Sequence, residues 1–243
     1  MSKKTILFCI PYAGGAASVY LKWKKYLAPE IELVPIELAG RGSRYNEDGY
    51  ENIEQAVNDI VMYIKSRTGY NREFCLFGHS MGSLLAYEAA FKLIESNHTP
   101  MHLFFSGMYP PYSEPIKLPS LHTLPDTIFL EEIYKLGGTP EEFLSNPKLQ
   151  KLFIPVLKSD YRIFEQYRFG EFKGKFDLDV TVFTGDQDEK VNKYGIENWR
   201  ECTSGDCELH RFEGGHFFIN EWTEQIVNRI NNVVTSYKYA KKL

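Results

Sequence analysis

A Gly-x-Ser-x-Gly motif at residues 78–82 is the feature of the sequence that most directly indicates chemistry. It follows a short apolar run and precedes a segment that is apolar nearly all round, so a strand, a sharp turn and a helix are expected in that order. Such a turn holds its serine, here Ser80, in a strained backbone conformation with the hydroxyl exposed. It also leaves no room for side chains two residues before and after the serine. We therefore predict that Ser80 is a nucleophile.

A serine hydroxyl is a weak nucleophile at neutral pH and needs a base within hydrogen-bond reach, itself oriented by a carboxylate. His216 lies in a Gly-Gly-His-Phe segment after the last predicted strand, where a loop can return its side chain to the serine. The other histidines fit this role less well. His79 is next to the nucleophile but should point elsewhere on the turn, and we expect it to pack. We predict His216 as the base.

The acid that orients the base has two candidates, Asp186 and Asp188, in the Thr-Gly-Asp-Gln-Asp segment that follows a predicted strand. Asp188 comes three residues after the glycine, where folds with this serine turn usually aim their acid, so we prefer it. Some relatives place the acid after the preceding strand. Residues 106–113 contain no Asp or Glu, which strengthens the choice of Asp188.

The tetrahedral intermediate of acyl transfer also needs backbone N–H donors for its oxyanion. One donor belongs to the residue after the nucleophile, which is Met81, and the second comes from the loop after the first strand. That loop reads Pro-Tyr-Ala-Gly-Gly at 11–15, and we assign Ala13. The same letters also fit a plain glycine turn.

Short apolar runs alternate with helical patterns along the chain, which indicates a parallel sheet covered by helices. Strands are predicted at 5–10, 32–36, 73–77, 101–105, 179–184 and 207–212, and helical stripes at 53–64, after the serine motif and at 222–237. Together with the motif, these elements predict an α/β-hydrolase fold with a mainly parallel sheet, in a single domain over 1–243.

Roughly seventy residues separate the fourth and fifth predicted strands, which is far more than an ordinary loop. Helix starts are predicted at Asp126, at Thr-Pro-Glu-Glu 139–142, at Asn146 and at Asp160, and a kink or end near Pro155. We expect a helical lid insertion over 108–178 within the domain. A structural elaboration with no gating role is the alternative.

Composition limits the classes of function. The formal net charge of −4 argues against a nucleic-acid partner, because such proteins usually carry a basic face. Neither a Gly-x-x-x-x-Gly-Lys loop nor a His-Glu-x-x-His pair occurs, so no cofactor and no metal is expected. The apolar run at 6–10 is short for a signal core, and no stretch is long enough to span a membrane. We expect a cytoplasmic protein that makes no membrane contact.

Motifs along almost the whole chain resemble those of the stand-alone (type II) thioesterases of nonribosomal peptide and polyketide synthesis. The segments are Pro-Tyr-Ala-Gly-Gly-Ala at 11–16, Gly-Arg-Gly-Ser-Arg at 40–44, Phe-Gly-His-Ser-Met-Gly at 77–82, Leu-Gly-Gly-Thr-Pro at 136–140, Leu-Lys-Ser-Asp-Tyr at 157–161, Gly-Asp-Gln-Asp at 185–188 and Gly-Gly-His at 214–216. The two insertion segments are more specific than the serine motif, which is common among hydrolases of the fold. Ala39 departs from the family pattern, in which proline is expected.

The resemblance implies a substrate, namely an acyl or aminoacyl group held as a thioester on the phosphopantetheine arm of an acyl or peptidyl carrier protein of a synthetase. Hydrolysis would clear stalled or misprimed carriers. Two other functions stay open. One is an esterase or lipase acting on small or lipid esters, and the other is a catalytically silent protein that only binds a synthetase.

The resemblance also implies an acidic carrier, whereas this chain is itself net acidic. Docking should therefore need basic residues near the mouth of the site. Candidates from the 40–44 loop and the insertion are Arg41, Arg44, Lys158 and Arg162. For each of them, an ordinary solvated charge or an internal ion pair is the alternative.

Overall fold

The parallel sheet predicted from the sequence is present in the computed structural model, which describes residues 3–69, 72–113, 120–135, 137, 143 and 145–240. Among these residues, six strands form one sheet in the order β2-β1-β3-β4-β5-β6, and every neighbouring pair is parallel. The strands are β1 (Thr5–Ile10), β2 (Ile31–Pro35), β3 (Phe74–His79), β4 (Leu103–Ser106), β5 (Val180–Gly185) and β6 (Cys207–Phe212). Their ends lie within two residues of the predicted ones.

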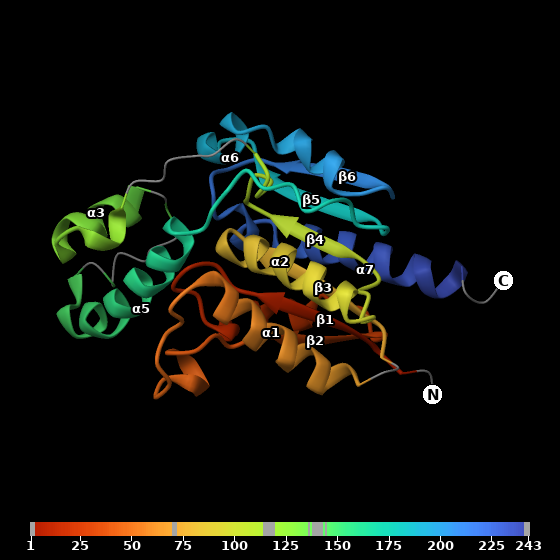
Figure 1. Cartoon of the computed structure of the whole chain (residues 1–243), viewed down its shortest axis with the longest axis horizontal. Coiled ribbons are helices and arrows are strands. Elements are labelled where there is room, and N and C mark those ends of the chain that lie inside the picture. Colours follow the sequence, from red (N-terminus) through yellow and green to blue (C-terminus); the bar gives the residue numbers. More distant parts are fainter. Residues whose placement is uncertain are drawn as a thin grey trace.

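Helices cover both faces of the sheet (Figure 1). On one face lie α1 (Ile53–Thr68) and α2 (Met81–Glu95), and on the other lie α7 (Thr223–Ala240) and the 3₁₀ helix η1 (Ala17–Lys25). Shorter helices are η2 (Gly42–Arg44), α6 (Glu189–Lys193), η4 (Ile196–Cys202) and η5 (Phe218–Asn220). The central strands β1 and β3 are buried along their whole length, as expected for a parallel sheet covered on both sides. None of the helices in the described ranges is long and apolar enough to cross a membrane.

The location of the site follows from the point at which the order of the strands in the sheet changes direction. β1 and β3 are neighbours in the sheet although β2 lies between them in the sequence, so the chain winds outward from this pair in both directions. In open α/β sheets, ligands bind outside the carboxyl ends of the strands at such a point. Ser80 directly follows β3, and the 11–15 loop directly follows β1. Two of the sequence motifs are therefore brought to the same edge of the sheet.

Between β4 and β5 the chain leaves the sheet and forms η3 (Leu121–Thr123), α3 (Asp126–Lys135) and α5 (Pro147–Glu165). The two α-helices lie beyond the carboxyl ends of the strands (Figure 1). They share a small apolar core of their own, made by Phe129, Leu130, Ile133, Phe143 and Ile154. The helix start predicted at 139–142 lies outside the described residues.

One prediction about the insertion holds and another is wrong. Asn146 caps α5, because its side-chain oxygen accepts hydrogen bonds from the backbone N–H groups of Lys148 and Leu149 at 3.1 and 3.3 Å. The helix then runs through Pro155 to Glu165. Asp160 begins no helix, because it lies inside α5, where it is buried and paired with Arg41. An aspartate at a helix start and an aspartate that pairs with a distant cation look alike in local sequence.

Candidate active site

The turn that carries Ser80 has the strained geometry predicted for a nucleophile. Ser80 connects β3 to α2 with φ 55° and ψ −121°, in a region that residues other than glycine rarely adopt. A Cβ on Gly78 would lie 2.0 Å from the carbonyl oxygen of Gly82, and a Cβ on Gly82 would lie 2.2 Å from the carbonyl oxygen of Ile10. Both positions must therefore be glycine, one because of the helix and the other because of β1.

The structure brings Ser80, His216 and Asp188 into one hydrogen-bonded series. His216 Nε2 lies 2.9 Å from Ser80 Oγ, and His216 Nδ1 lies 2.6 Å from Asp188 Oδ2. The tautomer with its proton on Nδ1 satisfies both contacts, since it donates to the carboxylate and leaves Nε2 to accept the serine proton. Asp188 is 6% exposed. The arrangement can activate a hydroxyl for attack on a carbonyl carbon.

The second acidic candidate serves a different part of the histidine loop. Asp186 Oδ1 accepts a hydrogen bond from the backbone N–H of Gly214 at 2.9 Å, and the N–H of Gln187 donates to the Gly214 carbonyl at 2.9 Å. Asp186 thus fixes the approach of the loop, and Asp188 contacts the imidazole of His216.

His79 is buried beneath the site, in agreement with its expected packing role. Its Nδ1 lies 2.9 Å from Ser106 Oγ, and its ring centroid lies 5.2 Å from that of His216. Burial, and then the charge that His216 can carry, hold the pKa of His79 well below its usual value. The residue is therefore neutral at physiological pH, and its ring packs beside the ring of His216.

Two backbone N–H groups face no competing acceptor. Met81 is the first residue of α2, where helix N–H groups lack partners within the helix. Ala13 lies in the turn after β1, which is closed by a 2.9 Å hydrogen bond from the N–H of Gly15 to the carbonyl of Tyr12. In the described part of the chain, neither the Ala13 nor the Met81 N–H donates to a protein acceptor. Both remain available to an oxyanion beside Ser80.

A cavity of about 400 Å³ opens onto Ser80 and His216. Its lining is almost entirely uncharged, and much of its apolar wall belongs to the insertion, with Ile133 from α3 and Leu149, Phe153, Leu157 and Tyr161 from α5. The sequence reasoning did not single out these wall residues. The signal available was the apolar stripe within the insertion, which reads equally well as ordinary core. No three His, Cys, Asp or Glu side chains of the described residues are grouped in a way that could hold a metal ion.

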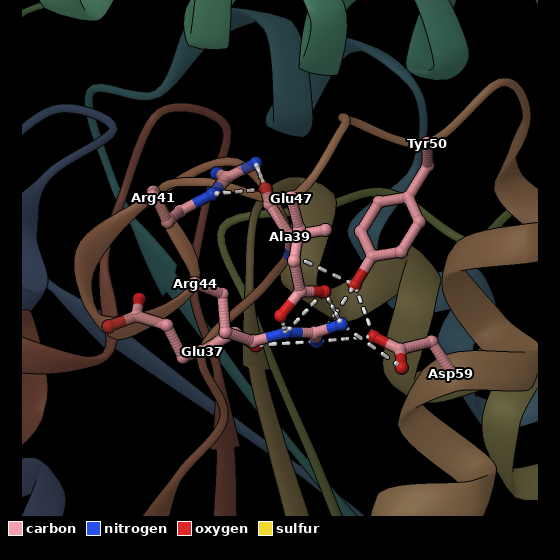
Figure 2. A network of polar contacts seen from close by, with 7 residues as sticks. All are labelled: Glu37, Ala39, Arg41, Arg44, Glu47, Tyr50 and Asp59. Carbon is pink, nitrogen blue, oxygen red and sulfur yellow. Dashed lines mark hydrogen bonds and ion pairs between the residues drawn. The ribbon is translucent and has the colours of Figure 1, made fainter.

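Arg44, one of the four predicted docking residues, belongs to a network of intramolecular polar contacts (Figure 2). Its guanidinium contacts the Glu47 carboxylate at 2.5 Å and the Asp59 carboxylate of α1 at 2.6 Å. The Tyr50 hydroxyl also donates to Asp59 and accepts from the N–H of Ala39 at 3.1 Å. The network fixes the 39–50 loop to α1.

The remaining docking candidates are also engaged internally. Arg41 is only 6% exposed, so the prediction that it meets an external partner is wrong. Lys158 pairs with Asp126 at 2.5 Å, and Arg162 donates to the backbone carbonyl of Tyr50 at 3.0 Å. Arg41, Arg44 and Lys158 thus form internal ion pairs, and Arg162 makes an internal hydrogen bond to a backbone carbonyl.

Known proteins resemble this chain over most of its length. A family model described as a thioesterase domain matches residues 5–234. The gramicidin S biosynthesis protein GrsT of Aneurinibacillus migulanus is 36% identical over 219 residues, which cover 90% of this chain and 84% of GrsT.

Solved structures extend the likeness to three dimensions. The crystal structure of ClbQ from the colibactin NRPS/PKS pathway matches with a TM-score of 0.91 and 34% identity, over 98% of this chain and 100% of that one. The type II thioesterase BorB from the borrelidin biosynthetic cluster matches with a TM-score of 0.86 and 29% identity, over 96% and 93% of the two chains. The α/β-hydrolase fold predicted from the sequence is thereby confirmed.

Proposed function

The chain belongs to the thioesterase family, and we propose that it is a type II thioesterase that hydrolyses acyl groups from synthetase carrier proteins, with Ser80, His216 and Asp188 as its catalytic residues. The observation that carries the proposal is the hydrogen-bonded series from Asp188 through His216 to Ser80, whose Ser80 end opens onto a cavity with an almost entirely uncharged lining. That combination suits attack on the carbonyl of an apolar acyl group.

The mechanism follows from the geometry. Ser80 Oγ attacks the thioester carbonyl carbon while His216 Nε2 takes the hydroxyl proton, and Asp188 stabilises the imidazolium that forms. The N–H groups of Met81 and Ala13 hold the oxyanion of the tetrahedral intermediate. The intermediate collapses to an ester on Ser80, and the pantetheine thiolate leaves with the proton from His216. A water molecule, deprotonated by His216, then attacks the ester and releases the carboxylic acid and Ser80.

The cavity supports an acyl substrate carried by a longer arm. Its apolar wall can bury a hydrocarbon chain, and burial of apolar area contributes roughly 25 cal/mol per Å² removed from water. The carrier protein and its phosphopantetheine arm would remain outside, with only the thioester end reaching Ser80. Clearing stalled or misprimed carriers is the task that fits such a site in a protein related to GrsT and ClbQ.

The insertion over 108–178 is proposed to act as the lid of this cavity. The support is its position beyond the carboxyl ends of the strands, together with the wall residues that α3 and α5 supply. A lid of this kind excludes water from the acyl chain while the ester on Ser80 waits for hydrolysis.

Intact-protein mass spectrometry tests the proposal. Carrier proteins loaded with different acyl groups are weighed before and after addition of the enzyme, with Ser80→Ala as the matched control. Loss of the acyl mass, leaving free phosphopantetheine, is expected with the wild type alone. A higher kcat/KM on simple or lipid esters would indicate an esterase instead. Absence of both turnover and labelling of Ser80 by a fluorophosphonate would indicate a silent binding protein.

A further inference from the structure

Arg41 and Asp160 form a buried ion pair beside the proposed oxyanion site. Arg41 Nη1 lies 2.6 Å from Asp160 Oδ2, and Arg41 Nη2 lies 2.7 Å from Asp160 Oδ1, so the contact is bidentate. The two side chains are 6% and 2% exposed. Removing two charges from water costs about as much as their attraction returns, so a buried pair is weak evidence for a role in stability alone. Its other contacts indicate what else it does.

The same pair makes hydrogen bonds to the turn after β1 that contains Ala13, Gly14 and Gly15, called the glycine turn below. The N–H of Gly14 donates to Asp160 Oδ2 at 2.7 Å, and Arg41 Nη1 donates to the carbonyl of Gly15 at 3.3 Å. Gly14 has φ +76°, and a Cβ there would lie 2.4 Å from Leu157 Cδ2 of α5. Because the Gly14 N–H is held by Asp160, the peptide plane between Ala13 and Gly14 cannot rotate freely. The Ala13 N–H lies in the preceding peptide plane, whose Tyr12 carbonyl accepts from the Gly15 N–H at 2.9 Å. Both peptide planes on either side of Ala13 are therefore held.

Arg41 is also hydrogen-bonded within its own loop. Its guanidinium donates to the carbonyl of Ala39 at 3.4 Å, and the N–H of Ala39 donates to the Tyr50 hydroxyl of the Arg44 network (Figure 2). That network ends on Asp59 in α1. A continuous series of polar contacts therefore runs from α1 through Arg41 to Asp160 on α5 and to the glycine turn.

We propose that Arg41 and Asp160 are positioning residues that aim the Ala13 N–H at the oxyanion and make its placement depend on the docking of α5 against the glycine turn. The inference rests on the proposed function, because it assumes attack by Ser80 on an acyl carbonyl. Neither residue touches the substrate. Their effect on the reaction passes through the backbone of Gly14 and Gly15.

The test separates this role from a structural one by means of three variants and a control. Asp160→Asn removes the charge at constant volume. Arg41→Met/Asp160→Leu replaces the pair by apolar side chains, an exchange that often leaves stability unchanged or raised. Arg41→Lys retains the charge but loses the bidentate contact. Glu88→Gln is the control, since Glu88 is a 7% exposed carboxylate that accepts from Tyr167 and Lys173 outside the site.

Each variant is assayed on an acyl N-acetylcysteamine thioester, with thermal unfolding as the measure of folding. The inhibition constant of an alkyl trifluoromethyl ketone, which forms a tetrahedral oxyanion on a serine, is measured in parallel. In the double variant, kcat should fall by roughly 10²- to 10³-fold, as for loss of one oxyanion donor. Asp160→Asn should lower kcat less, because its amide oxygen can still accept from the Gly14 N–H. The inhibition constant of the ketone should rise in proportion while KM stays nearly constant. Arg41→Lys should show a smaller loss of kcat, and Glu88→Gln none.

A double variant that folds and has wild-type kcat would overturn the proposal. The proposal would also be overturned if Asp160→Asn lowered kcat no more than Glu88→Gln does. Should those variants not fold, an unchanged kcat and ketone inhibition constant in Arg41→Lys would overturn it equally. Failure of the proposed function has a different signature, because the wild type itself would then release no acid from the thioester.

Discussion

Asp186 and Asp188 leave the same turn after β5 but bind different parts of the histidine loop. Asp188 contacts His216 Nδ1 at 2.6 Å, whereas Asp186 accepts from the backbone N–H of Gly214 at 2.9 Å. One carboxylate can therefore stabilise a charged imidazole, and the other only positions the loop that carries it. The two aspartates differ in what their removal should do to the reaction.

Asp188→Asn should lower kcat by about 10⁴-fold, because an amide in place of the carboxylate favours the wrong tautomer of His216. Asp186→Asn should lower kcat far less, since an amide oxygen can still accept from Gly214. Steady-state kinetics on one acyl thioester compares the two variants directly. The reverse ranking would move the acid of the reaction to Asp186.

Ser80→Ala should abolish hydrolysis and leave the fold intact, because it removes the nucleophile and no packing group. Turnover within tenfold of the wild type would contradict the assignment. A second variant, Ser80→Gly, should be equally inactive but more stable than Ser80→Ala by about 1 kcal/mol, since glycine adopts a positive φ without strain. Thermal or urea unfolding of the two inactive variants measures this difference. Equal stabilities would show that the turn stores no strain at Ser80.

Narrowing the cavity should change which acyl chains are hydrolysed. Ile133 on α3 lines the cavity, so Ile133→Phe should lower kcat/KM for long acyl thioesters by at least about tenfold, the usual effect of a misfitted methylene group. The acetyl thioester should be hydrolysed as before, because an acetyl group fills little of the cavity. Ile133→Val is the matched control for disturbance of α3. An equal loss for acetyl and long-chain substrates would place the acyl chain elsewhere.

His102 should make the protein less stable in acid. Burial lowers the pKa of His102 to about 4, more than the nearby charge of Asp179 raises it. The unfolded chain, with a histidine pKa near 6.5, therefore binds more protons than the folded chain between these values, and stability falls as pH drops through that range. His102→Gln, which can still contact Thr181, should lose about 2 kcal/mol less than the wild type between pH 7 and pH 4.5. Urea unfolding at both pH values measures this, and parallel losses would show that His102 does not titrate there.

Local patterns in the sequence were sufficient to predict the sheet and the residues around Ser80. The inner strands are short apolar runs, and the serine motif follows from steric limits within five residues, so both leave a local signal. Asp188 and His216 are predicted from their places after predicted strands, and Met81 from its place next to Ser80. These are properties that a chain segment shows without reference to distant partners.

The parts that could not be predicted depend on contacts between distant segments. Arg41 and Asp160 are 119 residues apart in the sequence, and nothing near either one indicates the other. Asp160 is predicted to begin a helix because aspartate often does so, and Arg41 is predicted to meet a carrier protein because it is a basic residue of the 40–44 loop. One clue was present, since Asp160 lies three residues after Leu157 and would fall on the buried face of a helix.

The cavity is lined by the insertion and by the segment after β1, while the residues proposed for catalysis follow other strands. The insertion helices supply much of the apolar lining, while Ser80, Asp188 and His216 follow β3, β5 and β6. Under the proposed function, much of the wall that meets the acyl chain and the groups that carry the chemistry lie in separate segments, which can diverge at different rates among homologues or be exchanged by design. Asp160 is the exception, because it belongs to the insertion yet accepts a hydrogen bond from the Gly14 N–H in the turn after β1. A chimaera that exchanges the insertion must retain it.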